Sequence, residues 1–296
     1  MDRFIKDQYQ LYKDNRAVLH VDDEAFAKLS PQGRSTASEL MSSNNTFRNF
    51  AMQEEQNFYR NHACSIKTID ALQIAEDKKD WIIVGAGPSL DNELDYLRSI
   101  QGNKVILAAS TVYKKLTHAG IYADYYIAID PQNRTYDHMK NIEKQEKYSP
   151  LILRDSANWQ FAEKYPGEKY LIPTGEMFYA NALYSITKTK TWDVKSNVSP
   201  FAIEVAVKMG AKNIELIGVD LAYPGEKTHA EGTMDNSGVN TNGMVKIKDV
   251  KGKEVYTSEV FVDCIEEIEE LINENKNVRF YNKSKIGAYI KGCIAE

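Results

Sequence analysis

The stretch that decides the fold is WIIVGAGPSLDN, residues 81–92. Four apolar residues run directly into GAGPS at 85–89, and a leucine, an acid and an amide follow. An apolar run of strand length that ends in glycines predicts a buried strand and then a sharp turn into a helix. In an open parallel sheet, such a turn lies beyond the carboxyl end of its strand, where ligands bind. N–H groups at the start of the helix favour an anion there, typically a phosphate.

Further strand-length runs alternate with helix-like segments on the carboxyl side of this stretch. The runs lie at 104–109, 124–129, 151–154, 169–172, 213–219 and 278–282, and the clearest helical segments at 92–100, 111–120, 200–210 and 258–275. Apolar strands that alternate with helices indicate a parallel sheet covered on both faces. The sequence therefore predicts an α/β fold over residues 61–296, with a Rossmann-like, doubly wound and mostly parallel sheet.

Two segments depart from this alternation. Residues 244–257 hold two alternating runs around Lys251-Gly252, which predicts a hairpin, and Ser258 is placed to cap the helix that follows. Residues 1–60 are polar, with an amphipathic stretch at 47–60. They predict an N-terminal helical extension that packs on the main domain or on a second subunit, so a homodimer is one expectation.

Charge and cysteine content narrow the class of protein. The formal net charge is -5, which argues against non-specific binding to nucleic acid. The three cysteines include no CxxC pair, so neither a zinc knuckle nor a disulfide framework is expected. The N-terminus lacks an apolar signal-peptide core, and no apolar run approaches the ~20 residues of a membrane span. We expect a cytoplasmic protein.

The glycine loop (residues 85–90) fits neither of two well-known phosphate motifs. No Gly-Lys-Ser/Thr follows it, which excludes a Walker A loop, and Leu90 stands where a dinucleotide fingerprint has its third glycine. The next strand ends in Ala108-Ala109-Ser110, without the acid that would hold a ribose hydroxyl. A tight turn with no ligand stays open as the alternative.

Polar residues also follow other strands of the predicted sheet. They are Ser110 and Thr111, Asp130, Thr174, the stretch 197–200 before a helix, and Asp220. Each one alone is more typical of a helix cap than of a ligand group. Because the carboxyl ends of parallel strands share one edge, the set together predicts a ligand site at that edge.

The loop at 218–238, GVDLAYPGEKTHAEGTMDNSG, is long and rich in Gly, Asp and Asn. Long ordered loops in compact domains are often functional. Of the five histidines, His229 is the one in such a loop at a strand end, and its ordinary pKa suits a general base at neutral pH. Tyr223 is the nearby candidate to donate a proton to a leaving phosphate.

Four ordered segments carry a family resemblance. They are VGAGPSL, ADYYIAIDP, ELIGVDLAYPGEKTHAEG and YNKSKIGAYIKG. The chain resembles the MptE-like superfamily, named after a 6-hydroxymethylpterin pyrophosphokinase, and within it the central domain of the bacterial motility accessory factors. That domain is similar to sialyltransferases with a Gly-x-Gly-Pro-Ser-Leu loop, and its family is implicated in transfer of nonulosonic (sialic-acid-like) sugars from CMP donors to flagellin hydroxyls.

The resemblance implies roles for individual residues. Gly85, Ala86, Gly87, Pro88 and Ser89 would hold the nucleotide phosphate. Ser110, Asn197 and Ser199 would lie at the nucleotide, Asp130 and Asp220 would orient the donor or the acceptor, and His229 would be the general base. By their positions in the sequence, Thr111 and Asp130 are further candidate nucleotide contacts, and Tyr223 is a candidate at the reacting groups beside His229 and Asp220. Val198 departs from the sialyltransferase pattern because it has no hydroxyl.

Three functions follow as expectations. The first is a glycosyltransferase that moves a nonulosonic sugar from a CMP donor to a hydroxyl acceptor on a protein or glycan, with no cofactor required. The second is the pyrophosphokinase activity, which needs Mg²⁺ and for which Asp130, Asp220 and Asp235 are the candidate metal carriers. The third is a non-catalytic nucleotide-binding protein.

Overall fold

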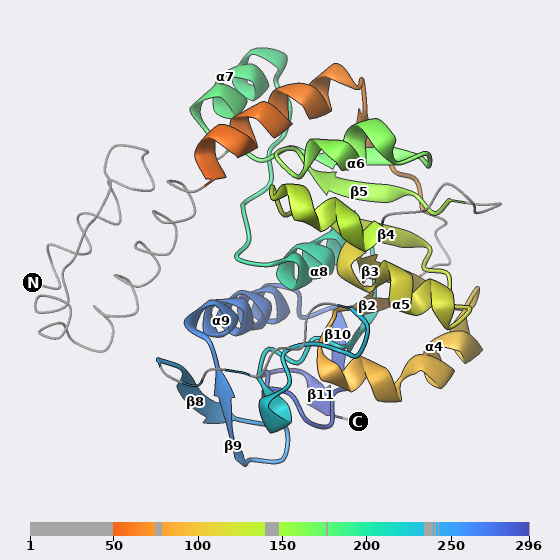
Figure 1. The fold of residues 1–296 in the computed structure, drawn as a ribbon, viewed down its shortest axis with the longest axis vertical. Coiled ribbons are helices and arrows are strands. Elements are labelled where there is room, and N and C mark those ends of the chain that lie inside the picture. The colour runs from red at the N-terminus through yellow and green to blue at the C-terminus, as the bar shows by residue number, and fades with distance from the viewer. Residues whose placement is uncertain are drawn as a thin grey trace, which may run out of the picture. The chain divides into compact units, whose positions relative to one another are not determined.

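A computed structural model describes residues 50–74, 79–139, 148–175, 177–233, 239, 241 and 243–295. The chain divides into two compact units, residues 1–56 and 57–296. Most of the predicted extension at 1–60, and Asp235, lie outside the described residues. A helix over residues 50–63 overlaps the predicted amphipathic stretch at 47–60 and extends three residues beyond it (Figure 1).

The second unit is built on one nine-stranded sheet, in which the strand pairs are parallel. The predicted doubly wound α/β fold is thereby confirmed. Across the sheet, the order is β1 (Lys67–Thr68), β6 (Lys169–Ile172), β5 (Leu151–Arg154), β4 (Tyr125–Ala128), β3 (Val105–Ala109), β2 (Asp80–Val84), β7 (Asn213–Ile217), β10 (Arg279–Asn282) and β11 (Ile294–Ala295).

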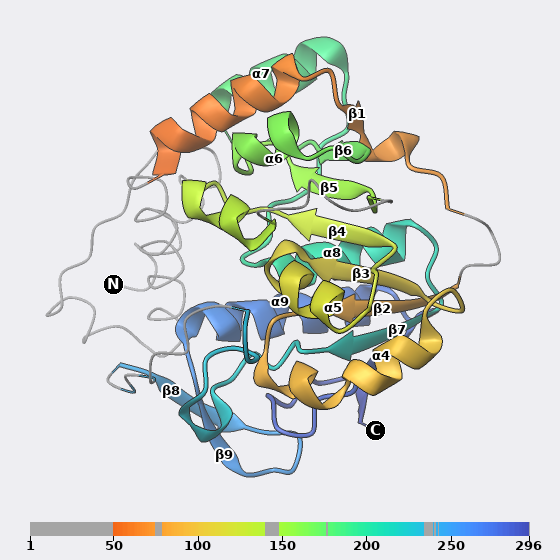
Figure 2. The same ribbon diagram turned by 45° about the vertical axis from the view of Figure 1, so that its right-hand side comes forward.

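Helices cover both faces of this sheet (Figures 1 and 2). In β2, Trp81 and Ile83 point to one face, and Ile82 and Val84 to the other, because successive strand residues alternate. The first face packs against α8 (Val198–Lys208) and α9 (Glu259–Glu274). The second packs against α4 (Leu94–Ile100), α5 (Tyr113–His118) and α6 (Trp159–Lys164). Burial on both faces explains why the strands read as continuous apolar runs.

Other elements lie outside this layered core. The predicted hairpin forms as β8 (Val245–Lys248) and β9 (Glu254–Thr257), and the Ser258 hydroxyl accepts the N–H of Phe261 at the start of α9, as expected. Helix α7 (Phe178–Thr187) packs with Phe58 in a separate apolar cluster. Among the described residues of the second unit there are also five short 3₁₀ helices: η1 (Ile69–Ala71), η2 (Pro88–Asn92), η3 (Ser110–Val112), η4 (Asn133–Met139) and η6 (Pro224–Glu226).

The order of the strands places the topological switch between β2 and β7. From β2 the chain moves outward through β3, β4, β5 and β6, and it then returns to pair β7 with the other side of β2. The carboxyl ends of these two strands carry the glycine loop and the start of the 218–238 loop. In open α/β sheets, this is the position at which ligands bind.

Candidate functional site

The glycine loop meets the loop after β7 in direct backbone contact. Gly85 donates its N–H to the carbonyl of Ile217 at 2.8 Å, and Gly87 donates to that of Gly218 at 2.7 Å. A Cβ on Gly85 would lie 2.5 Å from the Gly218 oxygen, which no side chain tolerates. Both N–H groups therefore already have acceptors, and the glycines are required by the close approach of the two loops.

Asp220 joins these loops through its side chain. The N–H of Ser89 donates to Oδ2 of Asp220 at 2.7 Å, at the start of η2. Burial raises the pKa of Asp220, and the hydroxyls of Ser284 and Ser89 and the Ser89 N–H partly oppose that rise. A carboxylate thus stands where the sequence predicted that a phosphate would meet the loop.

Two buried polar atoms in this contact make no hydrogen bond of acceptable geometry within the described residues. They are the hydroxyl oxygen of Ser89 and Oδ1 of Asp220. Their residues are 4% and 2% exposed, respectively. Buried polar groups in native proteins are nearly always satisfied by protein, water or a bound group. The pair therefore marks the place where a polar ligand would find a hydrogen-bonding group on each loop.

The segment after β10 forms a third wall. Ala288 donates its N–H to the Asp220 carbonyl at 2.7 Å, and Gly287 donates to the Ser284 hydroxyl at 2.8 Å. A Cβ on Gly287 would lie 2.7 Å from the Asp220 carbonyl oxygen. Sequence reasoning did not assign Ser284 to the site; the polar stretch directly after a strand was the available signal, but it points there only once β10 is known to lie beside β7.

The segment that holds His229 lies on the glycine loop. Ala230 donates its N–H to the carbonyl of Ala86 at 2.8 Å. Asp91 accepts the N–H of Glu231 at 3.3 Å and pairs with Lys115 at 2.6 Å. Burial, and then the charge of His138, lower the pKa of His229. A neutral imidazole at neutral pH can accept a proton, and the assignment of His229 as a base stays a prediction.

Asp130 lies in a charged cluster after β4. Its Oδ1 accepts the N–H of Gln132 at 2.8 Å. Burial raises the pKa of Asp130, while the Gln132 N–H and the charges of Arg134, His138 and Arg154 oppose the rise. Burial also lowers the pKa of His138, and Lys114 adds to that effect. The charge of His138 acts on both Asp130 and His229, and the sequence did not single out this histidine.

The remaining candidate residues lie on other elements. Ser110 begins η3 and is buried, Thr111 follows it half-buried, and Asn197 caps α8 by accepting the N–H of Val198 at 2.6 Å. Ser199 is buried in the first turn of α8. The Tyr223 ring stacks on Phe261 with centroids 5.3 Å apart. Among the described residues, no hydrogen bond or ion pair joins any of these side chains to the glycine loop.

Thr174, the strand-end residue after β6, serves a buried carboxylate that sequence reasoning passed over. Its N–H and its hydroxyl donate to Asp155, each at 2.7 Å. The Tyr184 hydroxyl also donates to Asp155, at 2.8 Å, and lies 3.0 Å from Nε2 of His62.

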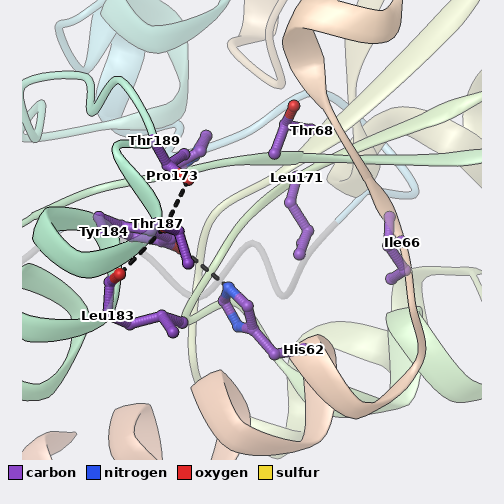
Figure 3. Close-up of a pocket in the computed structure, with 9 residues that line it drawn as sticks. All are labelled: His62, Ile66, Thr68, Leu171, Pro173, Leu183, Tyr184, Thr187 and Thr189. Carbon is purple, nitrogen blue, oxygen red and sulfur yellow. Dashed lines mark hydrogen bonds between the residues drawn. The ribbon is translucent and has the colours of Figure 1, made fainter.

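A cavity of about 360 Å³ lies beside this network, at the β1–β6 edge of the sheet (Figure 3). In Figure 3, His62 and Tyr184 point toward one another at one end of the cavity, with Leu171 and Ile66 on its other side. None of its lining residues belongs to the loops after β2, β7 and β10. The cavity is therefore separate from the candidate site at the switch point.

The fold and these loops define a class of protein: a doubly wound α/β domain with a candidate site where the loops after β2, β7 and β10 meet. The chain belongs to the 6-hydroxymethylpterin diphosphokinase MptE-like family, whose model matches residues 56–226, more than half of the chain. The resemblance read from the sequence motifs is confirmed at this level.

Solved structures add a likeness of fold. The structure of the MAf glycosyltransferase from Magnetospirillum magneticum AMB-1 aligns with a TM-score of 0.65 and 19% identity over 90% of this chain. This chain spans 42% of that protein's length. The structure of GsuK bound to ADP aligns with a TM-score of 0.20, too low to indicate a shared fold.

One curated relative matches over a short region. An uncharacterized protein of Treponema pallidum (strain Nichols) is 38% identical over 55 residues, which are 19% of this chain and 26% of that protein.

The described residues lack two features. No group of three or more His, Cys, Asp or Glu side chains in these parts of the chain is arranged to hold a metal ion. No helix among them is long and apolar enough to cross a membrane.

Proposed function

We propose that this protein is a nucleotide-sugar-dependent glycosyltransferase that transfers a nonulosonic sugar from a CMP donor to a hydroxyl acceptor. The observation that carries the proposal is the contact at the switch point, where Ser89 and Asp220 each present a buried polar atom that makes no hydrogen bond of acceptable geometry within the described residues, although the Ser89 hydroxyl lies near enough to Asp220 to lower its pKa. The shared fold with the Magnetospirillum MAf glycosyltransferase supports this reaction class.

The reaction needs one proton transfer and one leaving group. The acceptor oxygen attacks the anomeric carbon, the bond from that carbon to the phosphate oxygen breaks, and CMP leaves with the electron pair. His229 takes the acceptor proton, because its lowered pKa keeps the imidazole neutral at neutral pH. Its neighbour Ala230 is bonded to the glycine loop, so the base lies beside the loop that holds the phosphate.

The phosphate contact differs from the one that the motif suggested. The N–H groups of Gly85 and Gly87 already donate to the β7 loop, so they do not hold the phosphate in this conformation. The Ser89 hydroxyl can donate to a phosphate oxygen directly. The Ser89 N–H is available only when the phosphate replaces the Asp220 carboxylate.

Calorimetry and thermal shift with CMP, CDP, ADP and ATP, each with and without Mg²⁺, test the proposal. A ligand that binds only the native state raises the melting temperature. We expect CMP to stabilise the protein without metal, and Ser89→Ala to weaken that stabilisation. Ser156→Ala is the matched control, because Ser156 is an equally buried serine whose hydroxyl makes no hydrogen bond and lies in the loop after β5. Absence of CMP binding would refute the donor assignment.

The family description favours one alternative, a Mg-ATP-dependent 6-hydroxymethylpterin pyrophosphokinase. Mg²⁺ would neutralise the phosphate charge, and Asp220 and Asp130 would be its protein ligands. Each of these carboxylates has its own hydrogen-bond donor, Ser89 N–H and Gln132 N–H, and the described residues hold no three-ligand cluster. Stabilisation by ATP only with Mg²⁺ would favour this reaction over sugar transfer.

The second alternative is a non-catalytic nucleotide-binding protein. It predicts nucleotide binding that Ser89→Ala weakens, together with no turnover of any CMP-sugar and no effect of His229 substitution on binding.

A further inference from the structure

The helix of residues 50–63 ends against the strand-end loops of the sheet with two asparagines on one face. Asn57 and Asn61 lie four residues apart, which places them on adjacent turns of that face. Both are fully buried. Burying an amide costs free energy unless its donors are satisfied, so two such residues in an apolar contact indicate a specific use.

Each asparagine amide bridges two carbonyl oxygens of the loops after β4 and β5. Asn57 donates to Pro131 at 2.9 Å and to Ser156 at 3.1 Å. Asn61 donates to Asp155 at 2.9 Å and to Ala157 at 2.7 Å. The bond from Asn57 to the Pro131 carbonyl matters most for the site, because Pro131 directly follows Asp130.

A third asparagine, from the β5 loop itself, completes the support of the Asp130 turn. The N–H of Asn158 donates to the Asp130 carbonyl at 3.0 Å, and its side chain donates to the carbonyls of Gln132 at 2.9 Å and Asn133 at 3.0 Å. The carbonyls of 130–133 therefore all accept hydrogen bonds, and Asn57 provides the one that comes from outside these two loops.

We propose that Asn57, supported by Asn61, is a positioning residue that fixes the Asp130 turn at the edge of the candidate site. The helix of residues 50–63 thereby becomes part of the machinery that shapes the site. This inference depends on the proposed function in one respect, because it treats Asp130 as a site residue. Its test requires neither a bound nucleotide nor enzymatic turnover.

The readout is the ionisation of His138, measured by NMR on the ligand-free full-length protein. The Asp130 carboxylate and Asp137 raise the pKa of His138, whereas burial, Lys114 and Arg134 lower it. A displaced Asp130 therefore lowers the midpoint of the His138 titration. Asp130→Asn removes the charge and sets the scale of the shift.

We expect Asn57→Ala to lower the His138 midpoint by a measurable part of the Asp130→Asn shift. Arg60→Ala is the matched control on the same helix, since Arg60 bonds Glu163 at 2.7 Å and covers the Trp159 ring, and among the described residues it makes no hydrogen bond to either bridged loop. This control loses a helix-to-sheet contact and should leave the His138 midpoint unchanged. Signals of the His62 ring report whether the helix stays docked.

Three results would overturn the proposal. One is an unchanged His138 midpoint in folded Asn57→Ala, and another is an equal shift in Arg60→Ala. If Asn57→Ala does not fold, Asn57→Ser replaces it with a donor too short to reach Pro131, and an unchanged midpoint in that variant counts against the proposal in the same way. Failure of CMP to bind would refute the proposed function and leave this result standing.

Discussion

At the scale of single residues, the site depends on the absence of a side chain at Gly87. Gly87 has an ordinary extended φ of -68°, so its conformation alone does not require glycine. A Cβ at this position would lie 2.5 Å from Oδ2 of Asp220 and 2.8 Å from the Gly218 oxygen. Glycine is required here by the approach of the two loops and not by backbone strain.

Gly87→Ala should therefore destabilise the protein through overpacking, by about 1–3 kcal/mol in urea unfolding. It should also weaken CMP stabilisation, because the clash of the added methyl group with the Gly218 oxygen displaces the glycine loop that presents the Ser89 hydroxyl. Gly175→Ala is the control: its Cβ would lie 3.3–3.6 Å from Thr191, so only the nearest contact is slightly tight. Equal losses in both variants would contradict the argument.

The second prediction concerns Asp220, whose substitution should affect the free energy of unfolding and nucleotide binding in different ways. Burial raises its pKa in the folded protein above the ordinary 3.8, so ionisation of Asp220 costs folding free energy as the pH rises through that range and beyond it. Asp220→Asn should raise the free energy of unfolding at pH 7 by about 1 kcal/mol, and the gain should vanish below pH ~4.

Asp220→Asn also distinguishes the glycosyltransferase from the pyrophosphokinase. In the glycosyltransferase, Asp220→Asn removes a negative charge from the phosphate position, so CMP should bind more tightly. In the pyrophosphokinase, Asp220 would be a ligand of Mg²⁺, and the variant should lose Mg-ATP binding. Calorimetric titration of both nucleotides decides between them.

His229 carries the third prediction. Because its pKa is lowered, the neutral base is present at neutral pH and is lost as the pH falls through a value below the ordinary 6.5. We expect the acid limb of kcat/KM for transfer to lie below that value, and His229→Gln to reduce kcat by about 10²–10⁴-fold. His118→Gln, at the exposed end of α5, should change neither. Unaltered transfer by His229→Gln would remove it as the base.

Residues close in sequence were predictable, whereas residues joined by the sheet order were not. The position of the glycine loop and its neighbourhood with Asp220 follow from one rule about parallel sheets. The same rule does not predict that the N–H groups of Gly85 and Gly87 are already occupied. That depends on their 2.8 and 2.7 Å hydrogen bonds to carbonyls about 130 positions further along the chain. Ser284 and His138 were missed for the same reason.

At the scale of elements, strands with strong apolar runs were found within about two residues of their observed ends. The last predicted strand residues at 218–219 leave the sheet because Gly218 turns the chain at a φ of +65°. Helix α6, with the sequence WQFAEK, was not among the predicted helical segments. Helix α7 ends at Lys188 with a φ of +54°, a left-handed position where glycine is usual, so the sequence shows no stop signal.

The contact between α7 and the helix of residues 50–63 provides a prediction at this scale. The Tyr184 hydroxyl lies between Asp155 and His62, and burial next to Asp155 raises its pKa. Tyr184→Phe should cost about 1–3 kcal/mol, because Asp155 loses a donor while remaining buried. Tyr113→Phe, which removes a buried hydroxyl with no hydrogen bond in the described chain, should be nearly neutral. Equal costs for the two changes would show that Tyr184 acts by packing alone.

At the scale of the whole molecule, the folding unit begins inside the helix of residues 50–63, since the second compact unit starts at residue 57. Asn57, Asn61 and His62 connect this helix to the loops after β4 and β5 and to α7. A chain that starts at residue 64 would leave four carbonyl oxygens of these loops without their asparagine donors.

We therefore expect residues 64–296 to lose the cooperative thermal transition that residues 50–296 retain. The truncation removes four hydrogen bonds of about 1 kcal/mol each and exposes the apolar cluster that Phe58 forms with α7, and together these losses approach the 5–15 kcal/mol by which a domain is usually stable. Circular dichroism melting of the two truncations, with the full chain as reference, measures the difference. A transition in 64–296 within a few degrees of that in 50–296 would show that the sheet folds without this helix, and the asparagine contacts would then orient the Asp130 turn without stabilising the fold.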